Sequence, residues 1–295
     1  MTQRPLILAS ASPRRSQLLT QAGIPFERLI APLDEDALAA VYTGPIDLLG
    51  EYLAQQKALA GWRQLPAGER RNGSRYVLAS DTTVLLDGVS LAKPRDLDEA
   101  AWMLQQLRGR THSVATGVAL IEAGDRNIER PMHGDDTVGA SGGCPRTRWN
   151  GDEGHSALKG RSTDRTGFES PGDQAEPTVL CSATSATRVT MRPYSDDEIA
   201  AYVATGDPLD KAGAYSIQHP AFQPVASLAG CHLGVIGLPL CLVSALLGGV
   251  EPRRIVLATA GELDSGCPWS ALCRPPFPDT GDDAISIQPL VGDKP

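Results

Sequence analysis

The sequence predicts an α/β protein, because segments with strand patterns and segments with helix patterns are mixed along the chain. The first such pair is the apolar run P-L-I-L-A-S at residues 5–10, which is typical of a buried strand, followed at once by a helix pattern. Of the 295 residues 41% are hydrophobic and 21% are charged, which suffices for one large domain or two small ones. The chain contains no internal repeat.

The first helix is predicted from its ends. Ser12 is a favoured N-cap residue, Pro13 suits the first helical position, and Gly23 suits the C′ position. A second strand is expected at residues 26–30, and it leads to an acidic loop at residues 34–36.

The next segment combines a helix with a hairpin. A helix is expected at about residues 47–62 and a buried strand at 76–80, after which comes the triplet Asp81-Thr82-Thr83. A short strand at 84–86 precedes Asp87-Gly88, a pair that favours a tight hairpin turn.

Three further elements have clear boundaries. A helix is expected at 97–107 and a strand with partial alternation at 111–122. Ser195 and Glu198 have capping-box spacing and open another helix, and the last helix is expected at 239–247.

Two segments depart from this pattern. Residues 124–177 are rich in Gly, Ser, Thr, Asp and Arg with sparse apolar residues, so we interpret them as an inserted, disordered loop. Residues 251–295 are rich in proline, and we interpret them as a C-terminal tail. The expected domain therefore spans residues 1–250 and is interrupted by the insertion.

Composition narrows the possible partners and the compartment. A net charge of −8 argues against broad binding to nucleic acid or to an anionic membrane. The six cysteines form no C-x-x-C pair, and the N-terminus does not resemble a signal peptide, so we expect reduced thiols in a cytoplasmic protein. The uncharged run at 234–250 is interrupted by Gly237 and Pro239, so a buried strand and a core helix are favoured over a membrane span.

The stretch L-A-S-A-S-P-R-R at residues 8–15 is a candidate anion site. A strand, a turn with Ser10 and Ser12, and a helix N-terminus present backbone N–H groups and hydroxyls to an anion. Arg14 and Arg15 oppose the helix dipole unless an anion lies between them and the backbone. The alternative is an ordinary helix start with surface arginines.

Four further residues are candidates, each with a plainer alternative. Lys57 continues an apolar helix face and either extends to solvent or projects into a ligand cleft. Asp81 follows a strand and is either a turn residue or a carboxylate for a divalent cation or a water. Glu35 is either a solvated loop residue or a second oxygen ligand, and Lys93 is either a turn residue or a phosphate contact.

The stretch D-K-A-G-A-Y-S-I-Q at residues 210–218 is the last candidate. Lys211 could meet a phosphate, Gly213 allows close backbone approach, and the amide of Gln218 could match both a carbonyl and an N–H on a base edge. The alternative is a structural turn.

Together these segments resemble the Maf family of nucleoside triphosphate pyrophosphatases. The resemblance covers residues 5–123 and 188–248 in order, through the motifs L-A-S-A-S-P-R-R, S-D-T-T-V, A-K-P-R-D, G-R-T-H-S-V-A-T-G-V-A-L, M-R-P-Y-S-D-D-E-I, D-K-A-G-A-Y-S-I-Q and V-I-G-L-P-L. It implies a mixed, elongated sheet with flanking helices and two lobes around a cleft, as in inosine triphosphate pyrophosphatases. It also implies metal-dependent cleavage, with Mg or Mn, between the α- and β-phosphates to give a monophosphate and pyrophosphate.

The resemblance assigns roles by matching positions. Asp81 corresponds to the catalytic carboxylate, and Glu35 with Asp81 corresponds to the metal ligands. The phosphate-binding positions are Ser10, Ser12, Arg14, Arg15, Lys57, Lys93 and Lys211. Arg14, Thr82 and Gln218 match the group that prefers dTTP and UTP. The expected partner is a nucleoside triphosphate, and a homodimer is left open.

The chain departs from the family pattern near the implied base pocket. Ser216 stands where glycine is usual, Gly234 stands where asparagine is common, and H-P-A-F-Q-P-V follows Gln218 in place of a glycine-rich run. Two alternatives therefore stay open. One is the same chemistry on 7-methyl-GTP or a modified nucleotide, and the other is a nucleotide-sensing module that regulates cell division through a partner.

Overall fold

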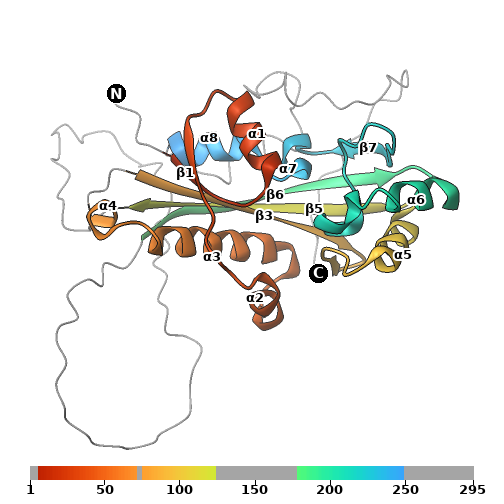
Figure 1. Ribbon diagram of the computed structural model, residues 1–295, viewed down its shortest axis with the longest axis horizontal. Coiled ribbons are helices and arrows are strands. Elements are labelled where there is room, and N and C mark those ends of the chain that lie inside the picture. Colours follow the sequence, from red (N-terminus) through yellow and green to blue (C-terminus); the bar gives the residue numbers. More distant parts are fainter. Residues whose placement is uncertain (1–5, 72–74, 124–177, 249–295) are drawn as a thin grey trace, which may run out of the picture.

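The computed structural model describes residues 6–71, 75–123 and 178–248 of the chain. These residues form a seven-stranded sheet with helices on both faces, which confirms the predicted α/β class (Figure 1). The predicted insertion at 124–177 and the predicted tail at 251–295 lie outside the described residues.

The sheet is mixed and elongated. Its strands are β1 (Leu6–Ala9), β2 (Phe26–Leu29), β3 (Arg75–Leu86), β4 (Val89–Leu91), β5 (Thr111–Ala123), β6 (Thr178–Met191) and β7 (Val225–Ala229). The order is β2-β1-β3-β5-β6-β7, with β4 paired to β3. β1 runs parallel to β2 and β3, whereas the other pairings are antiparallel.

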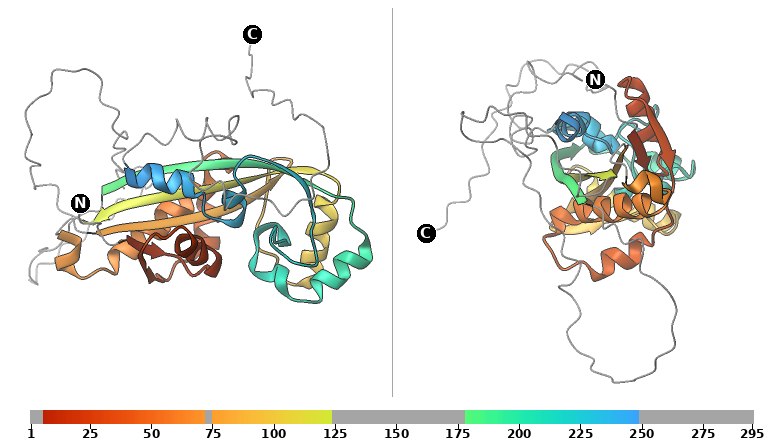
Figure 2. Two further views of the ribbon diagram at one scale, coloured as in Figure 1. Left: turned by 90° about the horizontal axis from the view of Figure 1, so that it is seen from above. Right: turned by 90° about the vertical axis from the view of Figure 1, so that its left-hand side faces the viewer.

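The helices cover the two faces and one end of the sheet. They are α1 (Pro13–Gln21), α2 (Glu35–Val41), α3 (Leu49–Arg63), α4 (Ala67–Arg71), α5 (Leu97–Leu107), α6 (Asp196–Val203), α7 (His232–Ile236) and α8 (Leu240–Gly248), with short 3₁₀ turns η1 (Ile46–Leu48), η2 (Asp207–Asp210) and η3 (Ala212–Ala214). Helix α3 runs along one face, and α1, α7 and α8 lie on the other (Figures 1 and 2). Helices α5 and α6 lie together at one end of the long strands (Figure 1).

Strand β3 separates two hydrophobic clusters by the alternation of its side chains. Val77 and Ala79 pack with α3 in the smaller cluster. Leu78 and Val84 belong to the larger cluster, which also holds apolar residues of α1, α5, α7 and α8. Because successive side chains of a strand point to opposite faces, Asp81 lies on the α3 face and Thr82 on the α1 and α7 face.

Several local predictions are confirmed. Ser195 and Glu198 form the predicted capping box at the start of α6. Asp87 and Gly88 join β3 to β4 with positive φ angles of 51° and 77°, as a type I′ hairpin turn requires. Gly23 follows α1 with φ of 65°.

Two local predictions are wrong, and two strands were missed. The acidic segment at 34–36 opens α2, because the Asp34 carboxylate accepts a hydrogen bond from the Ala37 N–H at 2.9 Å. The apolar run predicted as a strand before the last helix contributes to α7, since a short apolar run does not distinguish strand from helix. Strands β6 and β7 were not predicted as strands.

One further expectation concerns the membrane. Among the described helices, none has both the length and the apolar character needed to cross a bilayer.

The edge of β3 has a gap that positions the candidate site. On one side, β1 pairs with residues 76–78 and β4 pairs with 84–86. Among the described residues, no strand pairs with 79–83 on that side, although β5 pairs with them on the other. Asp81 and Thr82 therefore lie in the middle of one long strand, beside an open stretch of backbone, and not at a strand end as predicted.

Candidate functional site

A cavity of about 320 Å³ opens at the gap in the edge of β3. Every site residue predicted from the sequence lines this cavity: Ser10, Ser12, Arg14, Arg15, Glu35, Lys57, Asp81, Thr82, Lys93, Lys211 and Gln218. These residues come from segments that are far apart in the chain. Tertiary structure therefore gathers the scattered candidates at one place.

Three charged side chains form one wall, which we call the acid–lysine wall (Glu35, Lys57 and Asp81). Lys57 Nζ donates to Asp81 Oδ1 in a very short contact and lies 2.8 Å from Glu35 Oε2. The side chain of Lys57 is only 13% exposed, so it projects into the cavity and does not extend to solvent. The two carboxylates thus converge on the same cation.

Helix α3 can bring Lys57 to this position because it packs closely on the sheet. A Cβ at Gly50 would lie 3.1 Å from the Asp81 carbonyl oxygen, and one at Gly117 would lie 2.2 Å from Glu51 Cα. At Gly117 only glycine permits this close approach of helix and strand, and at Gly50 a larger residue would be tight.

Electrostatics favour an ionised Glu35. Burial by itself would raise the pKa of Glu35, but the ammonium of Lys57, with smaller contributions from Lys93 and Arg15, holds that pKa below its ordinary value. The acid–lysine wall therefore keeps this carboxylate charged at neutral pH.

Arg15 lies opposite this wall and is held by three acceptors. Its guanidinium donates to the Gly237 carbonyl oxygen at 2.9 Å, to Ser10 Oγ at 3.3 Å and to Thr82 Oγ1 at 3.5 Å. Burial lowers the pKa of Arg15, and the charges of Asp81 and Glu35 oppose that shift. Because a guanidinium carries five N–H donors, two remain for an anion.

The loop between β1 and α1 is fixed by backbone contacts. Ser10 Oγ accepts from the Ser12 N–H at 3.2 Å, and Arg28 donates to the carbonyl oxygens of Ser10 and Ala11 at 3.2 and 2.8 Å. Ser12 occupies the N-cap position, but its side chain makes no capping hydrogen bond, and the first turn of α1 has no acidic residue. The Ser12 hydroxyl is thus not used for capping.

The opposite rim of the cavity is formed by the segment from η2 to Gln218. Arg14 reaches this rim from α1, with Nη1 3.5 Å from Asp210 Oδ2. Gln218 is exposed, and Lys211 is buried. Lys93 is exposed at the cavity after β4, and Thr82 is half-buried beside Arg15.

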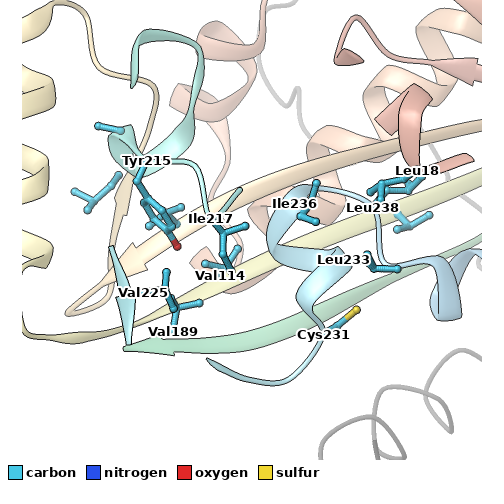
Figure 3. Packing of buried hydrophobic residues seen from close by; sticks show 14 of the residues in the cluster. Leu18, Val114, Val189, Tyr215, Ile217, Val225, Cys231, Leu233, Ile236 and Leu238 are labelled. Atoms are coloured by element: carbon cyan, nitrogen blue, oxygen red, sulfur yellow. The ribbon is translucent and has the colours of Figure 1, made fainter. Parts of the chain in front are cut away.

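Apolar residues complete the cavity beside this rim. Tyr215, Ile217 and Val114 lie together in Figure 3, and all three line the cavity. The Tyr215 hydroxyl lies 2.8 Å from Nε2 of the buried His112. Burial lowers the pKa of His112 to about 4, so this pair is neutral at physiological pH.

Several supporting residues were not identified from the sequence. Arg28, Ser80 and Gly237 hold the loop and Arg15, and the Gly237 carbonyl accepts from both Arg15 Nε and Ser80 Oγ. Arg28 gave no signal, because a lone arginine in an edge strand is common. Gly237 lies in the V-I-G-L-P-L motif, and its φ of 124° explains why glycine stands there.

Comparisons with known proteins show the family of the chain. The family described as "Maf-like protein" matches residues 5–138 and 157–250. A protein of Symbiobacterium thermophilum named "dTTP/UTP pyrophosphatase" is 37% identical over 235 residues, covering 80% of this chain and 88% of that protein. Proteins with the same name from Aromatoleum aromaticum and Escherichia coli O157:H7 are 35% and 33% identical, covering 83% and 84% of this chain and 95% and 94% of theirs. The chain therefore belongs to the Maf-like protein family.

Proposed function

We propose that the protein hydrolyses nucleoside triphosphates, with dTTP and UTP preferred, to a nucleoside monophosphate and pyrophosphate. The observation that carries this proposal is a single cavity in which Glu35, Lys57 and Asp81 converge opposite Arg15. A polyphosphate needs several cations, and cleavage of its anhydride needs a carboxylate that handles the proton of water. The names of the relatives support the same activity.

The phosphate chain would lie between Arg15 and the acid–lysine wall. The spare N–H donors of Arg15, the hydroxyl of Ser12 and the exposed ammonium of Lys93 are suited to phosphate oxygens. Arg14 would join them with the N–H donors that its contact with Asp210 leaves free, since that contact uses Nη1 only.

Asp81 would act as the general base. Its carboxylate faces the cavity and is held by Lys57, so it can accept a proton from a water that attacks the anhydride between the α- and β-phosphates. The bond from phosphorus to the bridging oxygen then breaks, and pyrophosphate leaves with its charge stabilised by Arg15, Lys57 and Lys93.

The donor set also fits a divalent cation. Glu35 and Asp81 converge on the Lys57 ammonium, and Mg²⁺ or Mn²⁺ is commonly bound by one or two carboxylates together with substrate phosphates. Within the described residues, no three His, Cys, Asp or Glu side chains gather, so the triphosphate would supply the remaining ligands. When bound, the metal would supply charge neutralisation on the phosphates.

Base preference would depend on the opposite rim. Gln218 can donate and accept together, which matches the carbonyl and N–H on the edge of uracil or thymine. Arg14 and Thr82 are the other two positions that favour the pyrimidine group. The apolar residues Tyr215 and Ile217 would pack against the base.

A nucleotide panel tests the proposal. The full chain is incubated with each common nucleoside triphosphate and 7-methyl-GTP in Mg²⁺ or Mn²⁺, and released pyrophosphate is measured. Asp81→Asn should lower kcat by at least about 10²-fold. Asp98→Asn, at an exposed carboxylate in the first turn of α5, is the matched control and should retain full activity.

Two outcomes would contradict the proposal. Wild-type release no higher than that of Asp81→Asn, for every nucleotide, would leave only a binding module. A clear preference for 7-methyl-GTP would preserve the chemistry and reject the pyrimidine assignment.

A further inference from the structure

The environment of Lys211 does not match that of a phosphate ligand. Its Nζ donates to the Asp207 carbonyl oxygen at 2.6 Å, to Asp207 Oδ1 at 2.9 Å and to Asp210 Oδ1 at 2.6 Å. An ammonium has three N–H donors and no acceptor, so all of its capacity is used within its own loop. The side chain is 8% exposed, and no donor is left for a ligand in the cavity.

One partner of Lys211 leads to the Gln218 side of the rim. Asp207 Oδ2 accepts from the Tyr202 hydroxyl at 2.6 Å, and the same hydroxyl accepts from the Ser216 N–H at 3.1 Å. Ser216 Oγ in turn accepts from the Gln218 N–H at 3.3 Å. Lys211 is therefore linked to the backbone that presents Gln218.

The aromatic contacts of Tyr202 strengthen this link. Its ring is buried, stacks on Phe222 with centroids 4.4 Å apart, and meets the His219 ring edge-on at 4.8 Å. Two residues of the segment 216–222 thus pack on the Tyr202 ring, and the hydroxyl of that ring donates a hydrogen bond to Asp207.

The other partner of Lys211 leads to Arg14. Asp210 Oδ1 accepts from Lys211, and Asp210 Oδ2 faces Arg14 Nη1 at 3.5 Å. Burial would raise the pKa of Asp207 and of Asp210, but hydrogen bonds from Tyr202 and Lys211 to Asp207, and from Lys211 to Asp210, outweigh it and keep both values low. The two carboxylates that bind Lys211 therefore stay charged at neutral pH.

From these contacts we infer that Lys211 is a positioning residue for base recognition and not a ligand of the phosphates. Lys211 connects the two residues of the opposite rim that are assigned to base recognition. Asp210 links Lys211 to Arg14. Asp207, Tyr202 and Ser216 link it to Gln218. Moving Lys211 onto a phosphate would break its three hydrogen bonds and leave the half-buried carboxylate of Asp207 without its cation, which is costly. This inference rests on the proposed function.

The test separates base selectivity from pyrophosphate affinity. Lys211→Met keeps the length of the side chain and removes its charge. It should lower the ratio of kcat/KM for UTP over CTP by about tenfold, because loosened base contacts discriminate less. Inhibition by added pyrophosphate should stay at the wild-type level. Lys93→Met is the matched control: it removes another lysine of the cavity, which is exposed, and it should weaken inhibition by pyrophosphate while leaving base selectivity unchanged.

A second variant guards against misfolding. Tyr202→Phe keeps the ring and Lys211 but removes the hydroxyl between Asp207 and Ser216, so it should reproduce the loss of selectivity. Weaker pyrophosphate inhibition in Lys211→Met with unchanged selectivity in both variants would overturn the inference. Wild-type protein without pyrophosphate release would instead refute the proposed function.

Discussion

Lys57 and Lys211 each bridge two carboxylates, yet they do so in different ways. The partners of Lys57 come from α2 and β3, far away in sequence, and both line the cavity. The partners of Lys211 lie one and four residues before it, and Asp207 does not line the cavity. The ion pairs of Lys57 join different elements and place charged groups in the cavity where a ligand binds. The ion pairs of Lys211 join residues of one loop and make that loop more rigid.

The largest expected effect comes from removing Lys57, which bridges the carboxylates of Glu35 and Asp81. Lys57→Met removes the cation between Glu35 and Asp81, so the carboxylates repel each other and the phosphates lose a counter-charge. We expect kcat/KM to fall by about 10²-fold or more, the scale typical of losing one electrostatic stabiliser. Steady-state kinetics of Lys57→Met and of Lys211→Met measure the difference between the two lysines. Equal losses of kcat in the two variants would show that the two lysines do not differ in role.

A smaller loss is expected at Arg15, where geometry matters besides charge. Arg15→Lys keeps the charge but cannot bond Gly237, Ser10 and Thr82 together. We expect KM for the triphosphate to rise by about tenfold, since one oriented charge-assisted contact contributes roughly 1.5 kcal/mol. An unchanged KM would mean that Arg15 serves only to hold the loop. Arg95→Lys, at an exposed arginine before α5, is the control.

His112 differs from both lysines, because it is buried and its partner, the Tyr215 hydroxyl, is neutral. Its pKa is about 4 when folded and about 6.5 when unfolded, so the unfolded chain binds the extra proton first. The contribution of neutral His112 to the free energy of unfolding is complete above about pH 6.5 and is lost as the pH falls toward 4. Over that window, unfolding experiments should show a loss of up to about 3 kcal/mol.

His112→Gln should flatten this acid limb of the stability curve. The slope will not vanish, because burial also lowers the pKa of His232, which acts with the same sign. An unaltered slope in the variant would show that His112 is not the group responsible.

The smallest effect is expected for an exposed pair. Arg108 Nη1 lies 2.6 Å from Asp196 Oδ1, as close as the contacts of Lys211, but Asp196 is 76% exposed. Asp196→Asn should change the free energy of unfolding by no more than about 1 kcal/mol and leave activity unaffected. Chemical denaturation of the variant checks this, and a larger loss would contradict the view that burial, and not distance, sets the strength of these pairs.

Local chemistry predicted much of the fold. The bounds of α5 matched the expected 97–107, and the β3–β4 hairpin followed from Asp87-Gly88. The acidic run that begins α2 was misread as a loop, because the same residues suit a solvated loop and a first helical turn. Strand β6 was missed, since its middle, S-A-T-S-A-T at residues 182–187, consists of small residues without a clear strand pattern, and the strand is held by pairing with β5.

The candidate site was predicted less completely. The residues at 8–15 and 210–218 were identified, but their partners were not, because a hydrogen bond between Arg15 and the Gly237 carbonyl joins positions 222 residues apart. The resemblance assigned both Lys57 and Lys211 to the phosphates, although their surroundings differ. The sequence around a lysine does not show whether its N–H donors bond to its own loop or face a cavity.

What the sequence by itself determined is the set of local structures and the charged groups available, because caps, turns and alternation depend on neighbours a few residues away. Only the tertiary structure decided that Asp81 sits in mid-strand at an unpaired edge and that Glu35 and Lys57 meet it there. The reason is that the gap between β1 and β4, which opens the cavity, arises from how strands distant in the chain align on β3.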